Sequence, residues 1–204
     1  MIDLENHIPV KLRLEREYRT YTLEEFLRKE VKSLHKHEFL DGKIIKMPYA
    51  KGPHNIIAAN IIGELHFAFK SLENKYLMFN SDQMIYSPSL NAGVYADALA
   101  VCEKPKYWDD NELLLINPLL VVEVLSKSTA SYDKRAKFDK YKTLESFKEY
   151  VLVEQNKCYV EVRYQLRKGL WQETIYEDIN EKINLQSIGI QLDIKDIYQN
   201  ITFS

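Results

Sequence analysis

The segment Pro118-Leu119-Leu120-Val121-Val122-Glu123-Val124-Leu125 decides the fold. Its near-continuous apolar run is typical of a central strand buried on both faces of a sheet. Glu123 is the single charged residue within it. A carboxylate inside such a strand costs free energy unless it is paired or binds a metal ion. We therefore predict a functional site at Glu123, with an ion pair to a nearby Lys or Arg, or exposure at a strand end, as the alternatives.

Asp97 interrupts a second uncharged run, residues 94–101. Enough chain separates it from Glu123 for a loop and a return strand, so the two acids can lie on neighbouring strands. Two carboxylates that converge from adjacent strands form a hard-oxygen site suited to Mg²⁺ or Mn²⁺. Taken alone, Asp97 is equally typical of a loop or cap carboxylate.

The rest of the chain predicts a mixed α/β fold in one domain, residues 21–204, after an N-terminal arm, residues 1–20. Thr22 and Glu25 have the capping-box spacing of a helix start, and Asp41-Gly42 predicts a hairpin turn. The expected helices are residues 53–72, 131–147 and a last turn at 193–198. The expected strands are residues 76–86, 94–101, 118–125, 150–153, 159–166 and 170–176, and residues 107–117 are expected to form a loop.

Three further residues are candidates for the site. Glu38 precedes the Asp41-Gly42 turn, where acids are also common without a function. His54 stands at the start of the 53–72 helix, where it can contact phosphate, support the metal ligands, or simply be solvated. Lys137 shares a helix face with Tyr141 and Leu144, so it lies on or beside the inward stripe. There it can orient water or offset phosphate charge, and the alternative is a lysine whose ammonium reaches solvent.

The charge distribution is more informative than the total. The formal net charge is −2 and the pI is near 6.2, which argues against a protein that coats nucleic acid through global charge. Residues 127–148 carry seven cationic and three anionic side chains, a net charge of +4. We predict phosphate contacts from Lys127, Lys134 and Arg135, although a solvated helix face explains the pattern equally well.

Composition points to an ordinary globular protein. No apolar run approaches the roughly 20 residues that span a bilayer, and the N-terminus shows no secretory pattern. Cys102 and Cys158 follow no metal-ligand spacing, and we expect both to be reduced thiols. We therefore expect a cytoplasmic protein with no membrane partner. A Gly-rich phosphate loop, a His-Glu-x-x-His motif and a nucleophile elbow are all absent from the sequence.

These motifs, in this order, resemble the Uma-type family of restriction endonucleases within the PD-(D/E)XK nuclease superfamily. The similarity rests on five stretches: HEFLDGKIIKM around Glu38, KGPHNIIAANI around His54, VYADALAV around Asp97, PLLVVEVLSKST around Glu123 and YDKRAKFDKYKT around Lys137. It covers about residues 20–200. The resemblance implies a restriction-endonuclease-like fold, a central mixed β-sheet flanked by helices.

The resemblance also implies roles for the site residues. Asp97 and Glu123 would be metal ligands, joined by the backbone carbonyl of Val124, and Glu38 would be a third acid beside them. Lys137 matches the family's helix lysine. The sequence departs from the superfamily pattern at two positions: Leu125 stands where a lysine is usual, two residues after the strand acid, and Ala96 stands where a proline is usual.

We therefore predict an endonuclease that uses Mg²⁺ or Mn²⁺ to hydrolyse phosphodiester bonds in nucleic acid, with DNA favoured. Two alternatives remain open: a non-catalytic nucleic-acid-binding or interaction domain with the same fold, and a metal-dependent hydrolase of another phosphate ester. A homodimer is compatible with cleavage of both strands, because such nucleases commonly pair by two-fold symmetry.

Overall fold

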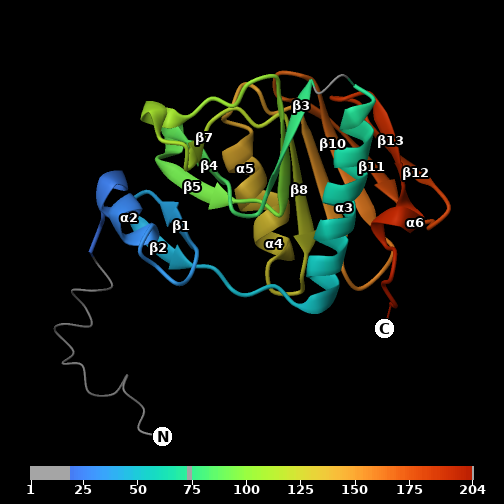
Figure 1. The fold of residues 1–204 in the computed structure, drawn as a ribbon, viewed down its shortest axis with the longest axis horizontal. Coiled ribbons are helices and arrows are strands. Elements are labelled where there is room, and N and C mark those ends of the chain that lie inside the picture. The colour runs from blue at the N-terminus through green and yellow to red at the C-terminus, as the bar shows by residue number, and fades with distance from the viewer. Residues whose placement is uncertain (1–18, 73–74, 204) are drawn as a thin grey trace, which may run out of the picture.

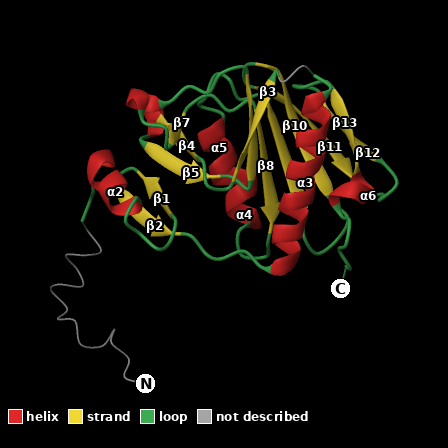
Figure 2. Cartoon of the chain, viewed as in Figure 1, coloured by secondary structure: helices red, strands yellow, loops and turns green. Residues whose placement is uncertain are grey.

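The computed structural model describes residues 19–72 and 75–203. The predicted arm, residues 1–20, therefore falls almost wholly outside the described part. The chain forms two mixed sheets and a separate hairpin (Figures 1 and 2). In order across the larger sheet, the strands are β11 (Leu170–Tyr176), β10 (Val160–Arg167), β9 (Glu149–Glu154), β8 (Leu120–Leu125), β6 (Ala98–Cys102) and β3 (Tyr76–Asn80). In the smaller sheet they are β2 (Lys43–Lys46), β1 (His37–Leu40), β5 (Ala92–Tyr95), β4 (Met84–Ser87) and β7 (Leu114–Leu115).

Strand β8 occupies the centre of the larger sheet, as its sequence predicts. It pairs antiparallel with β6 and parallel with β9, and all six of its residues are buried. Because side chains alternate along a strand, Val122 and Val124 join one hydrophobic cluster, whereas Val121 and Leu125 join the cluster on the opposite face. Glu123 shares the face of Val121 and Leu125.

A long helix, α3 (Gly52–Lys70), covers the face of the larger sheet that carries Val122 (Figure 1). Its buried residues are Ile57, Ile61, Leu65 and Phe69. The C-terminal hairpin β12 (Lys182–Leu185) and β13 (Ile190–Asp193), followed by α6 (Ile194–Ile197), packs beside α3. The sequence predicted α6, but it did not predict the β12–β13 hairpin.

The opposite face of the larger sheet is covered by a broken helix. It consists of α4 (Ala130–Tyr132), a π-helical turn (Asp133–Lys137) and α5 (Phe138–Tyr141). The predicted regular helix, residues 131–147, is therefore wrong in its internal geometry and in its end. It stops early because Leu144 and Phe147 turn back into the core of this face, where Phe138 and Tyr141 also lie.

The smaller sheet packs against α2 (Leu23–Glu30), whose Phe26 stacks on Phe39 of β1. The capping box predicted for α2 is present: the Thr22 side chain accepts a bond from the Glu25 backbone N–H, and the Glu25 carboxylate accepts one from Thr22 N–H. Within the described residues, no helix is long and apolar enough to cross a membrane.

Two predicted strands, residues 76–86 and 94–101, are each divided between the two sheets. The first becomes β3 and β4, and the second becomes β5 and β6 with a bend at Asp97. Apolar periodicity cannot show that a chain leaves one sheet for another, because both halves are buried. The predicted loop, residues 107–117, contains a 3₁₀ turn (Trp108–Asp110) and β7.

The hairpin turn between β1 and β2 gives a first prediction. Asp41 and Gly42 both have positive φ, +46° and +84°, and a Cβ on Gly42 would lie 3.1 Å from the Thr20 Cβ. We expect Gly42→Ala to lower the free energy of unfolding by about 1–2 kcal/mol, measured by urea denaturation. Gly52→Ala, where an added Cβ meets nothing within 4 Å, is the control and should cost nothing. Equal losses in both variants would contradict this account of the turn.

Candidate functional site

Glu123 lies at the centre of a buried polar cluster. Its side chain points from β8 toward the broken helix and the residue is 2% exposed. Lys137 Nζ lies 3.0 Å from Oε1 and 3.1 Å from Oε2, and the Tyr141 hydroxyl donates to Oε1 at 2.8 Å. Glu123 therefore forms the ion pair that the sequence analysis gave as an alternative to a functional site. Its cationic partner is Lys137, which was itself a candidate for the site.

Lys137 is the cation shared by the cluster. Its ammonium donates to the Tyr95 carbonyl at 2.8 Å and lies 3.3 Å from Asp133 Oδ1 and 4.0 Å from Glu38 Oε1. The residue is 6% exposed, so the alternative of an ammonium that reaches solvent is wrong. Three buried carboxylates thus surround one ammonium.

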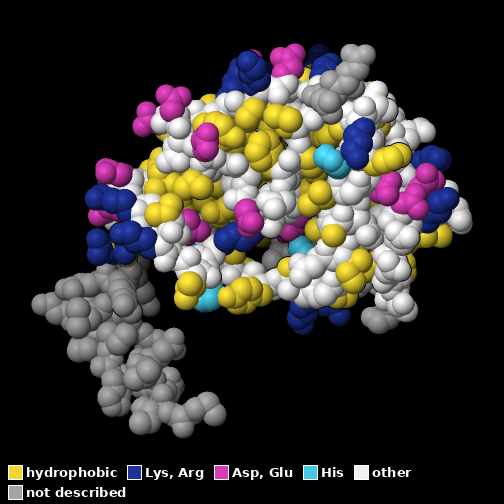
Figure 3. Space-filling model, viewed as in Figure 1, with side chains coloured by type: hydrophobic (Ala, Val, Ile, Leu, Met, Phe, Trp, Pro, Cys, Tyr) yellow, Lys and Arg dark blue, Asp and Glu magenta, His cyan; other side chains and the backbone are white. Residues whose placement is uncertain are grey.

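Glu38 reaches the cluster from the smaller sheet. It is buried on β1 and accepts a hydrogen bond from the Tyr132 hydroxyl at 2.7 Å. The cluster therefore lies where the two sheets meet, with the broken helix on its third side. Figure 3 shows a hollow on the molecule's face between α3 and the β1–β2 side, with acidic, basic and histidine side chains around it.

Asp97 and His54 form the part of the site on the α3 side, and His54 itself stands in the first turn of α3. Asp97 Oδ2 accepts a hydrogen bond from Val124 N–H at 2.7 Å and lies 3.2 Å from His54 Nε2. Ala98 pairs with Val122 in the antiparallel β6–β8 ladder. Asp97, one residue before Ala98, therefore lies beside Glu123, one residue after Val122. The two acids therefore lie next to each other as predicted, but Asp97 stands at the bend just before β6 and not within the strand. His54 Nδ1 is buried without a partner among the described residues.

Burial shifts the titration of these groups. Desolvation raises the pKa of Glu123 well above 4.5, and the nearby Asp133 and Asp97 carboxylates add to the rise while Lys137 opposes it. Desolvation likewise raises the pKa of Glu38, against the opposing effect of Lys137. Burial alone would lower the pKa of Lys137, but the carboxylates of Glu123, Asp133 and Glu38 outweigh it and raise that pKa.

His54 shows a similar balance between burial and charge. Desolvation would lower its pKa, but the contact with Asp97 outweighs this effect, so the pKa of His54 is raised above 6.5. The His54–Asp97 pair therefore favours a protonated imidazole.

The predicted phosphate-contacting residues are not brought together with the cluster, apart from His54. Lys134 is engaged by Glu161 at 3.1 Å and lies over the Tyr159 ring. Lys127 and Arg135 are exposed. Their nucleic-acid contacts stay a prediction.

Sequence reasoning did not assign to the site the residues that complete the cluster, Tyr132, Asp133 and Tyr141, although it placed Tyr141 on the helix face of Lys137. Their only signal was spacing, since Asp133 and Tyr141 stand four residues before and after Lys137. It also missed Tyr150 and Arg163, which hold the π-helical turn from the sheet side: the Tyr150 hydroxyl donates to the Asp133 carbonyl at 3.0 Å, and Arg163 Nη1 donates to the Lys134 carbonyl at 2.8 Å.

The donor set can be tested for a divalent metal ion. Asp97 and Glu123 supply hard oxygens on neighbouring strands, and both Asp97 contacts use Oδ2, which leaves Oδ1 as the oxygen available to a cation. Across residues 19–72 and 75–203, however, no three His, Cys, Asp or Glu side chains are already gathered around one metal position. The Lys137 ammonium contacts both Glu123 oxygens, so the chemistry fits a metal only if Lys137 withdraws from at least one of them.

The raised pKa values give a pH prediction for the metal-free protein. A carboxyl whose folded pKa is above its unfolded value stabilises the fold below the unfolded pKa, and this stabilisation is lost as pH rises through the folded pKa. We expect the free energy of unfolding in EDTA to fall from pH 5 to 8, by up to about 1.4 kcal/mol per pH unit for each such group. Chemical denaturation at several pH values measures the slope.

Two variants check the origin of this slope. Glu123→Gln should make the slope shallower, because it removes one of the groups whose pKa is raised on folding. Glu161 is also buried, but Arg163 and Lys134 hold its pKa below 4.5, so Glu161→Gln should lower stability without changing the slope above pH 5. An unaltered slope in Glu123→Gln would contradict the assignment.

Comparison with solved structures defines the class of fold. The chain is similar to the crystal structure of "a putative nuclease belonging to DUF820" from Anabaena variabilis, with a TM-score of 0.68 and 18% identity over 87% of this chain and 97% of that one. At this identity the likeness concerns the fold alone. The fold is the mixed α/β, restriction-endonuclease-like arrangement that the sequence predicted.

Comparison of sequences then shows the family. The Uma2 family model, described as "Putative restriction endonuclease", matches residues 23–195, and the chain belongs to this family. Two uncharacterized proteins from Synechocystis are similar to it. One is 33% identical over 144 residues, 71% of this chain and 80% of that protein, and the other is 27% identical over 180 residues, 88% of this chain and 92% of that protein.

Proposed function

We propose that this protein is an endonuclease that hydrolyses phosphodiester bonds in DNA with a bound Mg²⁺ or Mn²⁺ ion. The observation that carries the proposal is the convergence of Glu38, Asp97, Glu123 and Lys137, which are distant in sequence, at the junction of the two sheets. Perturbed carboxyls gathered in this way beside a hollow are typical of active sites. The family's description points to the same chemistry.

In this proposal Asp97, Glu123 and the Val124 carbonyl hold the ion. The ion would lower the pKa of a bound water and offset the charge of the pentavalent phosphate. The chain's own groups prepare the site: Val124 N–H and His54 fix one oxygen of Asp97, and Tyr141 fixes one oxygen of Glu123. Lys137 neutralises the carboxylates before the ion arrives and then supplies positive charge near the phosphate.

The test is nicking of supercoiled plasmid with Mg²⁺, Mn²⁺ or EDTA. We expect metal-dependent nicking by the wild type and a loss of about 10³-fold or more in Asp97→Asn, which keeps the size of the side chain but removes its charge. Asp139→Asn is the matched control, because Asp139 is an exposed acid on α5 that pairs with Lys142, and its activity should be unchanged.

The outcomes separate the proposal from its alternatives. Normal nicking by Asp97→Asn would remove the metal site from the mechanism. DNA binding without nicking in any metal favours the non-catalytic binding domain, and hydrolysis of small phosphoesters without nicking favours a different hydrolase. Cleavage of both strands at one site favours two copies related by two-fold symmetry.

A further inference from the structure

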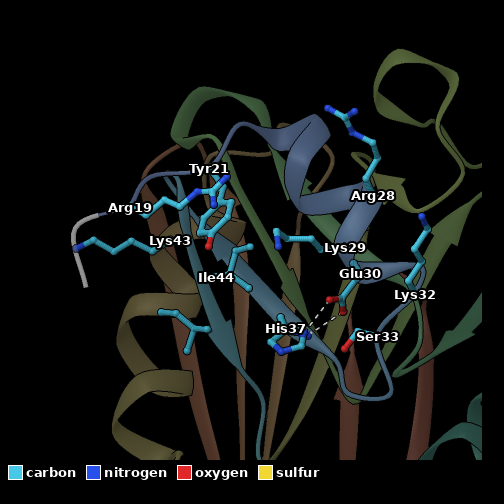
Figure 4. A pocket seen from close by; sticks show the side chains of 11 residues that line it. Arg19, Tyr21, Arg28, Lys29, Glu30, Lys32, Ser33, His37, Lys43 and Ile44 are labelled. Atoms are coloured by element: carbon cyan, nitrogen blue, oxygen red, sulfur yellow. Dashed lines mark hydrogen bonds and ion pairs between the residues drawn. The ribbon is translucent and has the colours of Figure 1, made fainter. Parts of the chain in front are cut away.

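A polar cavity of about 910 Å³ lies between α2 and the β1–β2 hairpin. Its walls come from residues 19–21, the end of α2 and both strands of the hairpin (Figure 4). The lining is strongly basic, with five Lys or Arg side chains and one histidine against a single acid, Glu30. The basic side chains are Arg19, Arg28, Lys29, Lys32, Lys43 and His37.

The single acid of this pocket is already engaged. Glu30 Oε2 lies 2.9 Å from His37 Nδ1, and Glu30 Oε1 accepts bonds from His37 N–H at 2.8 Å and from the Tyr95 hydroxyl at 3.3 Å. The Glu30 carboxylate is thus occupied by His37 and Tyr95, and it does not neutralise the Lys and Arg side chains at the rim of the pocket.

The rim cations are only weakly compensated. Arg19 pairs with Glu25 at 3.6 Å and Arg28 with Glu24 at 3.5 Å, and such exposed pairs contribute little. Within the described part of the chain, Lys29, Lys32 and Lys43 form no ion pair at all. Figure 4 shows the Lys29 side chain pointing from α2 into the pocket toward Ile44.

An aromatic ring holds two of these cations in place. The Arg19 guanidinium lies 4.7 Å from the centre of the Tyr21 ring and the Lys29 ammonium lies 5.3 Å from it. A cation–π contact orients a cation without cancelling its charge. The pocket therefore presents positioned positive charge to a ligand.

The helix dipole explains only part of this charge. Basic residues in the last turn of a helix are favoured by the partial negative charge at its C-terminus, which accounts for Arg28 and Lys29 on α2. Lys32 directly follows the C-cap residue of α2, whereas Arg19 precedes that helix and Lys43 lies on β2, and all three line the same cavity. A ligand with negative charge accounts for all of them.

The pocket lies close to the candidate site, on the other side of one strand. His37 and Glu38 are neighbours on β1, and neighbouring side chains of a strand point to opposite faces. His37 therefore faces the pocket while Glu38 faces the carboxylate cluster. Strand β2 is the edge of the smaller sheet and three of its four residues are exposed, so a bound chain can pass over this edge from one side to the other.

We propose that this pocket binds a backbone phosphate of the nucleic-acid strand whose scissile bond lies at the carboxylate cluster. The inference rests on the proposed function for its ligand, but it concerns binding and not cleavage. Phosphate contacts of this kind fix the register of a strand and carry no sequence information. The pocket therefore sets how the strand lies across the β2 edge.

The experiment measures DNA affinity in EDTA, where no cleavage occurs. The probes are fluorescein-labelled 20-base duplexes of two unrelated sequences and one matching single strand. Lys29→Glu/Lys43→Glu reverses charge on two opposing walls of the pocket, both at exposed positions. The control, Lys104→Glu/Lys168→Glu, makes the same change in net charge at exposed positions beyond the opposite end of the larger sheet.

We expect the pocket variant to bind at least about tenfold more weakly at 0.1 M salt, equally for both duplexes, with the slope of log K against log salt reduced by about 1–2. The control should stay within about twofold of the wild type, since it removes no phosphate contact. Equal affinity of the two double variants, or no DNA binding by the wild type, would overturn the inference.

The outcomes also keep this inference separate from the proposed function. If binding depends on the pocket but the wild type never nicks plasmid, the pocket stands and the endonuclease proposal fails. If the wild type nicks plasmid and the pocket variant binds and nicks like the control, the endonuclease proposal stands and the pocket assignment fails.

Discussion

Glu123→Gln is expected to abolish metal-dependent cleavage, by about 10³-fold or more, in a protein that remains folded. Gln has nearly the same shape, but it has no negative charge and its amide nitrogen cannot bind a cation. Lys137 retains Asp133 and the Tyr95 carbonyl, so its ammonium is not left without partners. Single-turnover cleavage measures the loss, and Mn²⁺ titration calorimetry measures the expected loss of metal affinity.

A matched control separates this effect from general damage to the sheet. Glu149 is a fully buried acid at the start of β9, next to β8, where it accepts hydrogen bonds from Gln186 and Ser187 N–H at 2.8 and 3.1 Å. Glu149→Gln breaks some of these bonds and should lower stability by about 1–3 kcal/mol. Its cleavage rate per folded molecule should nevertheless equal that of the wild type. Comparable losses of activity in both variants would mean that Glu123 acts only through the fold.

The fold was predictable wherever the apolar residues of a segment follow the periodicity of a single helix or strand. Strand β8, helix α3 and the Asp41-Gly42 hairpin all follow from local patterns, and two acids in apolar runs led us to expect that Asp97 and Glu123 can lie next to each other on neighbouring strands. The break at Asp97 was not predictable, because β5 and β6 are equally apolar and only the tertiary structure assigns them to different sheets.

The polar cluster was predictable only in part. Regular helix geometry placed Lys137 on the inward face, but it could not reveal the π-helical turn, which depends on Tyr150 and Arg163 from the neighbouring strands. The charge count over residues 127–148 included Asp133 only as one of three anionic side chains, whereas the structure buries it against Lys137. Long-range partners of this kind leave no local pattern.

The same geometry explains why the lysine arrives from a helix. Leu125 stands two residues after Glu123, so it shares the face of Glu123 on β8, and there it packs into the hydrophobic cluster with Phe138 and Leu152. That position on the strand therefore supplies apolar packing and no cation. The π-helical turn carries Lys137 to the carboxylates instead.

The largest stability effect is expected from Lys137→Met. Met fills a similar volume but leaves the carboxylates of Glu38, Asp133 and Glu123 without their shared cation. Removing one partner of a buried ion pair costs about 3–5 kcal/mol, and we expect a loss of this size in urea denaturation at pH 8 in EDTA. The loss should shrink at pH 5.5, because the raised pKa values of Glu38 and Glu123 let these groups protonate. Lys134→Met is the control, since Glu161 keeps Arg163 as a partner, and should cost about 1 kcal/mol or less.

Lys137→Met also tests whether the ammonium and a divalent ion compete for the same oxygens. In the wild type, an ion must displace Lys137 from at least one oxygen of Glu123, whereas in the variant neither oxygen contacts an ammonium and only Oε1 keeps a donor, the Tyr141 hydroxyl. Because a ligand that binds only the folded state stabilises it in proportion to its affinity, Mn²⁺ should raise the melting temperature of Lys137→Met more than that of the wild type. The variant should still fail to cleave, because it lacks the positive charge beside the phosphate. If Mn²⁺ stabilises neither protein, the carboxylates serve only to bind Lys137, and the proposed metal site must be abandoned.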